Sequence, residues 1–159
     1  AASVRSKNGI VVAGIDDVSV RFSKCCNPVP GDEIIGFVTR GRGVSIHRTD
    51  CINMMNLSEA DRHRIIEAEW QVSSEGKDNE LYDAEIIIYA NDRMGLLLEI
   101  TKVFTEMKID VKSMNIRTSK QGIATINVGF AIRGVEALHE VTKKVRQIEG
   151  IKDIQRTQA

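Results

Sequence analysis

Hydrophobic positions are spaced most regularly in the C-terminal half of the chain. Apolar and polar residues alternate over residues 84–88, which predicts a strand, because successive strand side chains face opposite sides. Apolar residues then recur at steps of three and four over residues 97–107, the spacing of one helix face. We expect Asn91 or Asp92 to cap this helix, since a short side-chain oxygen can accept from the free N–H groups of the first turn.

The alternation typical of strands and the three-and-four spacing typical of helices continue to the C-terminus. Strands are predicted near residues 111–119 and over residues 123–132, with a hairpin turn at Lys120-Gln121-Gly122 between them. A second helix is predicted over residues 138–148 and a last strand over residues 151–157. The order strand-helix-strand-strand-helix-strand predicts a ferredoxin-like βαββαβ domain, with an antiparallel sheet and two helices on one face.

The N-terminal half is less periodic and is predicted to be a small α/β domain. Strands are predicted at residues 10–13, 18–22, 34–39, 44–47 and 65–72. Two prolines and Gly31 predict a turn over residues 27–32. Thr49 or Asp50 should cap a short helix that ends at Leu57. The fold class of the whole chain is therefore α+β.

Charge marks the boundary between the two halves. Residues 59–80 hold three bases against seven acids, and residues 73–80 contain no large apolar side chain, which is typical of a linker. The predicted units are a tail at 1–9, a cysteine-containing domain at 10–72, a linker at 73–81 and the βαββαβ domain at 82–159.

Composition limits the class of protein. The chain has 159 residues, is 42% hydrophobic and 28% charged, and has a formal net charge of 0, which argues against disorder and against a uniformly basic nucleic-acid-binding chain. The longest apolar run, residues 86–90, is far shorter than the ~20 residues of a membrane span. The N-terminus lacks the pattern of a signal peptide, so we expect a cytoplasmic protein without a membrane partner.

Three cysteines and one histidine form the first candidate site. Cys25, Cys26, His47 and Cys51 offer three thiolates and an imidazole, which are zinc ligands. The adjacency of Cys25 and Cys26 counts against zinc, because neighbouring side chains in an extended segment face opposite sides. Small buried thiols are the second interpretation, and a Cys–His nucleophile is the third. No other cofactor is indicated, and the sequence proposes no catalytic residue.

Basic residues of the same domain form a second candidate site, for RNA. Exposed arginines beside flexible glycines can follow phosphates and stack on bases. The alternative is a solvated loop whose charges serve solubility. The candidate RNA-binding residues are Arg21, Lys24, Arg40, Arg42 and Arg48.

The first strand-to-helix turn of the C-terminal half is a third candidate site. Gly95 allows close backbone approach, and a helix N-terminus offers N–H groups to a carboxylate. The alternative is a well-capped helix without a ligand. The candidate residues are Asp92, Arg93, Met94, Gly95, Leu96 and Leu97.

Two long segments resemble a known family. Residues 20–32, VRFSKCCNPVPGD, and residues 35–51, IGFVTRGRGVSIHRTDC, closely resemble the C-terminal region of the RelA/SpoT family, the bacterial (p)ppGpp synthetase/hydrolases of the stringent response. Residues 10–72 resemble its conserved-cysteine, zinc-finger-like domain. Residues 82–157 look like its terminal ACT domain, with Asp92-Arg93-Met94-Gly95-Leu96-Leu97 at the ligand-binding turn.

This resemblance implies a regulatory fragment of a larger GTP pyrophosphokinase. The family's hydrolase and synthetase domains precede this region, so the chain itself is expected not to be an enzyme. In the family, such regions contact ribosomal RNA on ribosomes that carry uncharged tRNA, and they signal amino-acid starvation to the catalytic domains. The resemblance also groups Cys25, Cys26, His47 and Cys51 as residues that act together.

The ACT resemblance implies a second kind of function. ACT domains commonly bind small amino acids at a dimer interface, which here points to a branched-chain amino acid and a homodimer. The chain is then an allosteric amino-acid sensor and dimerisation module that acts without RNA. Regulation by thiol oxidation at Cys25 and Cys26 is a third, weaker interpretation.

Overall fold

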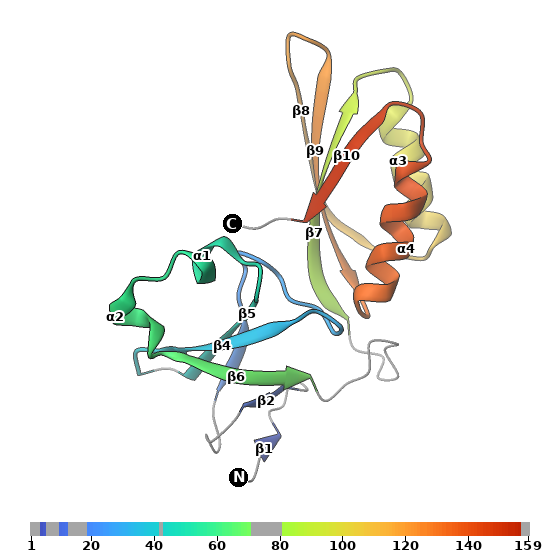
Figure 1. Ribbon diagram of the computed structural model, residues 1–159. Coiled ribbons are helices and arrows are strands. Elements are labelled where there is room, and N and C mark those ends of the chain that lie inside the picture. Colours follow the sequence, from blue (N-terminus) through green and yellow to red (C-terminus); the bar gives the residue numbers. More distant parts are fainter. Residues whose placement is uncertain (1–3, 6–9, 13–18, 42, 71–80, 157–159) are drawn as a thin grey trace.

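The described strands form two separate sheets, one in each half of the chain (Figure 1). A computed structural model describes residues 4–5, 10–12, 19–41, 43–70 and 81–156. The predicted linker therefore lies almost entirely outside the described residues, as do residues 13, 18, 71, 72 and 157 of the predicted strands.

The C-terminal sheet has the predicted βαββαβ order. Its elements are β7 (Tyr82–Asn91), α3 (Leu96–Glu106), β8 (Val111–Thr118), β9 (Ile123–Ile132), α4 (Val135–Arg146) and β10 (Ile151–Arg156). The four strands are antiparallel in the order β10-β7-β9-β8, and both helices cover one face of the sheet (Figure 1). Alternate residues of β7 and β9 are buried beneath the helices, which is the period that the sequence predicted.

The cap predicted for α3 is wrong. Asn91 continues β7, where it pairs with Ile123, and its N–H donates to the carbonyl of Gly150 at 2.8 Å. The helix begins later, after Gly95, whose φ of 80° turns the chain and which makes no side-chain cap. The strand pairing therefore takes precedence over the local capping preference of Asn91 and Asp92.

The N-terminal sheet has six strands in the order β1-β2-β6-β4-β5-β3. The strands are β1 (Val4–Arg5), β2 (Ile10–Val12), β3 (Val20–Phe22), β4 (Ile34–Thr39), β5 (Gly43–Arg48) and β6 (Ile65–Trp70). Among the described strand pairs of this sheet, only β3 and β5 run parallel to each other. Because β1 pairs with β2, the predicted tail contributes a short strand to the sheet.

Two single-turn helices, α1 (Ile52–Met55) and α2 (Glu59–Arg62), follow β5. The cap of α1 is Cys51, not Thr49 or Asp50, and no side chain closes it. Asp50 lies one residue before the cap position, and its carboxylate binds the Arg48 guanidinium. No hydrophobic period predicts α2, because none of its residues is buried.

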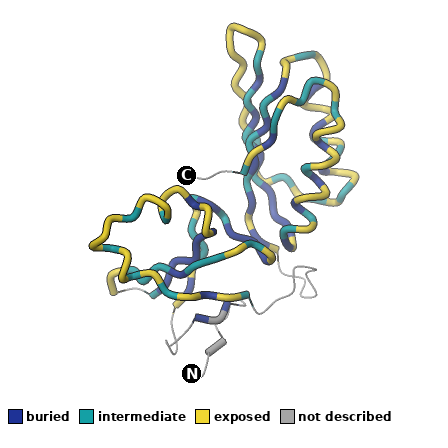
Figure 2. The backbone as a smooth tube through the Cα atoms, viewed as in Figure 1, coloured by how far each residue is buried: buried dark blue, intermediate teal, exposed yellow. Residues whose placement is uncertain are grey.

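Each sheet has its own hydrophobic core (Figure 2). The larger core lies between the C-terminal sheet and its two helices, and the smaller one packs against the N-terminal sheet. Phe22 and Trp70 are half-buried and contact both cores. Val29 of the N-terminal half is fully buried in the larger core, so the two domains share apolar packing.

The larger core generates a stability prediction. Phe104 is fully buried, with its ring centroid 5.1 Å from that of Phe130. Phe104→Ala should lower the free energy of unfolding by about 3–5 kcal/mol, because it removes apolar contacts and leaves a cavity. Leu98→Ala, on the same helix but at a side chain 72% exposed, is the matched control. It should change the free energy by less than about 0.5 kcal/mol. Urea denaturation measures both, and equal effects would contradict this packing.

Candidate metal centre

The candidate metal centre, formed by Cys25, Cys26, His47 and Cys51, lies where two parallel strands end side by side. β3 pairs with β5 in parallel, with Phe22 opposite Ile46, and the Ser23 N–H donates to the Ile46 carbonyl at 2.9 Å. The turn after β3 therefore lies beside His47. Cys51 follows the turn after β5, where its N–H donates to the Arg48 carbonyl at 3.1 Å.

Both adjacent cysteines reach the same point. Residues 24–26 form a turn, so the opposite orientation that an extended segment would impose on Cys25 and Cys26 does not apply. The Cys25 Sγ lies 3.9 Å from the Cys26 Sγ and 3.4 Å from the Cys51 Sγ. The His47 Nδ1 lies 3.4 Å from the Cys25 Sγ and 3.8 Å from the Cys26 Sγ. All four ligand atoms lie within 4.8 Å of one another.

These distances fit a tetrahedral metal site. With zinc–sulfur bonds of about 2.3 Å and a zinc–nitrogen bond of about 2.0 Å, the edges of a tetrahedron are about 3.5–3.8 Å long. The four separations between ligand atoms given above run from 3.4 to 3.9 Å and so lie close to that range. The three cysteines are free thiols rather than disulfides. The cluster could therefore hold a metal ion.

Burial of these four side chains disfavours their charged forms. It raises the pKa of the Cys26 thiol far above its usual value, and with the hydrogen bond to Cys25 it also raises the pKa of Cys51. Burial acts in the same direction on Cys25, but hydrogen bonds, the largest from Ser23, outweigh it and lower the pKa of that thiol. Burial lowers the pKa of His47, which favours the neutral imidazole that a metal requires. A divalent cation at the centre would favour the thiolate forms that burial disfavours.

Two further residues hold the ligands in place. The Ser23 hydroxyl lies 2.9 Å from the Cys25 Sγ. Arg48 donates through its backbone N–H to the Cys26 Sγ at 3.4 Å and through its guanidinium to the Cys26 carbonyl at 3.2 Å. The same guanidinium forms an ion pair with Asp50 at 2.8 Å. The sequence did not predict this role of Arg48, because a basic residue next to a histidine gives no indication that its side chain is buried.

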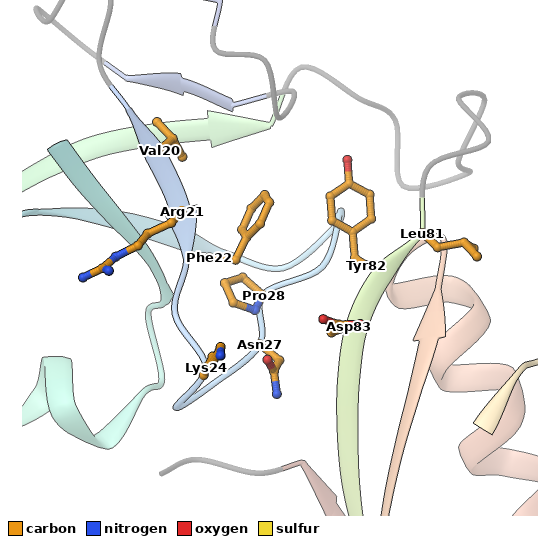
Figure 3. A pocket seen from close by; sticks show the side chains of 9 residues that line it. All are labelled: Val20, Arg21, Phe22, Lys24, Asn27, Pro28, Leu81, Tyr82 and Asp83. Atoms are coloured by element: carbon orange, nitrogen blue, oxygen red, sulfur yellow. The ribbon is translucent and has the colours of Figure 1, made fainter. Parts of the chain in front are cut away.

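The structure separates the candidate RNA-binding residues. Arg21 and Lys24 are exposed and line an open cleft of about 540 Å³ between β3 and β7 (Figure 3). Arg40 is exposed in the β4–β5 turn. Arg42 lies outside the described residues. Arg48 is a correction, since it is only 3% exposed and its guanidinium is taken up by Cys26 and Asp50.

The turn before α3 is only partly accessible. Asp92, Met94 and Gly95 are exposed, Arg93 is half-buried and Leu97 is 37% exposed. Leu96 belongs to the core, so its side chain is not available to a ligand. Arg93 ties the turn to its surroundings by donating to the Glu149 carbonyl at 3.1 Å and by an ion pair with Glu99.

Among the described residues, none of the helices has the length and apolar character needed to cross a membrane.

Comparison with known proteins assigns both halves of the chain. A family model described as the RelA/SpoT RIS domain matches residues 10–71, and one described as an ACT domain matches residues 78–156. The chain is 40% identical over 148 residues to a GTP pyrophosphokinase of Streptomyces coelicolor, covering 93% of this chain and 17% of that protein. It is 37% identical over 155 residues to the GTP pyrophosphokinase of Escherichia coli K12, covering 96% of this chain and 20% of that protein.

A solved structure is also similar. The ACT domain from the GTP pyrophosphokinase of Chlorobium tepidum aligns with 48% of this chain and 99% of its own length, at 23% identity and a TM-score of 0.44. The chain spans about a fifth of the length of the curated relatives it matches. The chain belongs to the RelA/SpoT family and corresponds to the C-terminal regulatory region of GTP pyrophosphokinases, an RIS domain followed by an ACT domain.

Proposed function

We propose that this chain docks a (p)ppGpp synthetase/hydrolase on ribosomal RNA and transmits amino-acid starvation to N-terminal catalytic domains. Its partners are then the ribosome with uncharged tRNA and the catalytic domains of the same protein, and its location is the cytoplasm. The chain itself catalyses no reaction. The observation that carries the proposal is the RIS-domain match over residues 10–71, the segment that holds the metal centre.

Exposed cations support the RNA contact. No ion pair joins Arg21, Lys24 or Arg40 to another side chain in the part of the chain that the structure describes. Such cations can neutralise phosphates without first breaking an internal contact. Arg42 stays in the proposed set on the basis of its position in the sequence, two residues after Arg40.

The RNA contact predicts salt-dependent binding to ribosomes. Replacing Arg21, Lys24 and Arg40 together by Ala should weaken binding, because each phosphate contact releases bound counterions. It should reduce the slope of log affinity against log salt by roughly one per lost contact. Co-sedimentation with purified ribosomes that carry uncharged tRNA, across a salt series, measures both effects. Replacing the exposed Lys120, Lys143 and Lys144 by Ala is the matched control, expected to bind as the parent chain does. Equal losses in both variants would refute the assigned surface.

We also propose zinc as the ion of the metal centre. Three thiolates and one imidazole favour zinc over hard cations such as magnesium and calcium. When bound, the ion would supply a cross-link between the turn after β3, the end of β5 and the start of α1. The small core of this domain then gains stability from ligation as well as from apolar burial.

The metal proposal predicts stoichiometric loading. Protein purified without chelator should contain about one equivalent of zinc, and cobalt substituted for it should give thiolate charge-transfer bands of a tetrahedral site. His47→Ala should weaken metal binding because it removes one ligand, while His139→Ala, at an exposed histidine, should not. Elemental analysis and absorbance titration measure these outcomes. Less than about a tenth of an equivalent in the parent protein would rule out a resident metal.

The ACT domain supports an alternative function, an amino-acid-sensing and dimerisation module that acts without RNA. The specific observation is the exposed apolar surface beside the predicted ligand turn, where Met94 is 97% and Leu98 72% exposed. Asp92, Met94 and Gly95 would surround a branched-chain amino acid, with backbone N–H groups facing its carboxylate. A second ACT domain would complete the site in a homodimer.

This alternative predicts stabilisation by ligand. Valine, leucine or isoleucine at millimolar concentration should raise the melting temperature, because a ligand of the folded state shifts the folding equilibrium. Glycine, which lacks an apolar side chain, is the ligand control. Asp92→Asn should remove the shift and Asp110→Asn, at another exposed aspartate, should retain it. The absence of any shift would count against a preformed site.

A further inference from the structure

One loop connects the metal centre with the ACT domain. The proline loop, defined as residues 27–32, directly follows Cys25 and Cys26 and precedes β4. Pro28 and Pro30 fix two of its φ angles, and Asn27 and Gly31 have positive φ angles of 46° and 101°. Its own hydrogen bonds close it further, since the Val29 N–H donates to the Asp32 carboxylate at 2.8 Å. A movement at one end of such a loop is not absorbed within it.

The near end of the proline loop is held by the metal-ligand cluster. The Asn27 N–H donates to the Ser23 carbonyl at 3.0 Å, closing the turn that carries both cysteines. The buried Arg48 guanidinium donates to the Cys26 carbonyl, one residue before the loop begins. The position of Asn27 therefore depends on the geometry of the ligands.

The far side of the loop is inserted into the ACT domain. Val29 is fully buried in the core of that domain, and the Pro30 carbonyl accepts from the N–H of Val135, the first residue of α4, at 2.8 Å. Arg156 of β10 forms an ion pair with Asp32 at 2.6 Å and donates to the Asn27 carbonyl at 2.9 Å. The Asp32 side chain is only 9% exposed, so this pair is shielded from solvent.

Aromatic packing lies alongside the same loop. Phe22 stacks on Trp70 and meets Tyr82 edge-on, with centroid separations of 5.5 and 5.6 Å. Figure 3 shows Phe22, Pro28 and Tyr82 together where β3 approaches β7. The Trp70 indole N–H donates to the Asp32 carbonyl at 3.1 Å, which ties this packing to the loop.

From these contacts we propose that the proline loop is a metal-dependent clamp, through which occupancy of the Cys–His centre fixes the ACT domain against the RIS domain. This proposal rests on the metal centre proposed above. With the ion bound, the loop is held in place at the cysteines. Val29, Pro30 and Asp32 then keep their contacts with the core, α4 and β10 of the ACT domain. Without the ion, the cysteine turn loses its cross-link and the contacts with α4 and β10 weaken.

The amide of Val135 reports the clamp directly, because its hydrogen bond crosses between the domains. NMR-detected hydrogen exchange of the whole chain should show Val135 exchanging at least about tenfold faster after the metal is removed by a chelator under reducing conditions. Amides that pair β7 with β9 inside the ACT sheet should keep their rates. Metal content is measured in the same samples.

A second variant tests the clamp with the metal still in place. Arg156→Ala removes the contacts with Asp32 and Asn27 but no ligand, so Val135 should exchange faster while metal content stays unchanged. Lys152→Ala, at an exposed residue of the same strand, should exchange at the parent rate.

Three results would overturn the proposal. The first is an unchanged Val135 rate in protein whose metal has been removed. The second is equal acceleration of Val135 and of the β7–β9 amides, which would mean general unfolding rather than release of a clamp. The third is an Arg156→Ala variant that behaves like Lys152→Ala. A chain that binds no metal at all would refute the metal centre itself, and that failure is separate because metal content is measured independently of exchange.

Discussion

The parallel pairing of β3 with β5 is the constraint on which the RIS domain depends. Parallel strands end at the same edge of a sheet, so the turn after β3 and the residues at the end of β5 must meet there. That edge brings together the metal centre, the buried Arg48 and the start of the proline loop. β3 is only three residues long, so few backbone hydrogen bonds hold it in place. The contacts of the Cys25 and Cys26 side chains just beyond its end then matter more than they would beside a long strand.

The ACT half could be predicted from the sequence because its elements are long and half-buried. β9 has ten residues and α4 twelve, which is enough for the periods of strand and helix to be distinguished. Local capping preference failed at Asn91, where the pairing of β7 with β9 extends the strand. The strand pairing depends on residues more than thirty positions away, which a local pattern cannot include.

The RIS half could be predicted only in part. Strands β2 to β6 and helix α1 coincide with predicted segments, whereas β1 and α2 do not, because two residues set no period and no residue of α2 is buried. The residue types identified the four candidate ligands, whereas their convergence depends on the turn at residues 24–26. Arg48 was assigned to the surface because composition does not reveal burial. The contact between Asp32 and Arg156 joins positions 124 residues apart, and no sequence pattern indicates it.

The place of Trp70 has a consequence for spectroscopy. It is the one tryptophan of the chain, and it lies between the two cores rather than inside either of them. Its indole contacts Phe22 of the RIS domain and Tyr82 of the ACT domain. Intrinsic fluorescence of this protein is therefore a signal of the domain boundary. An unfolding curve followed by tryptophan emission responds to loss of the packing between the domains as well as of the β6 strand, whereas circular dichroism describes the loss of all sheets and helices.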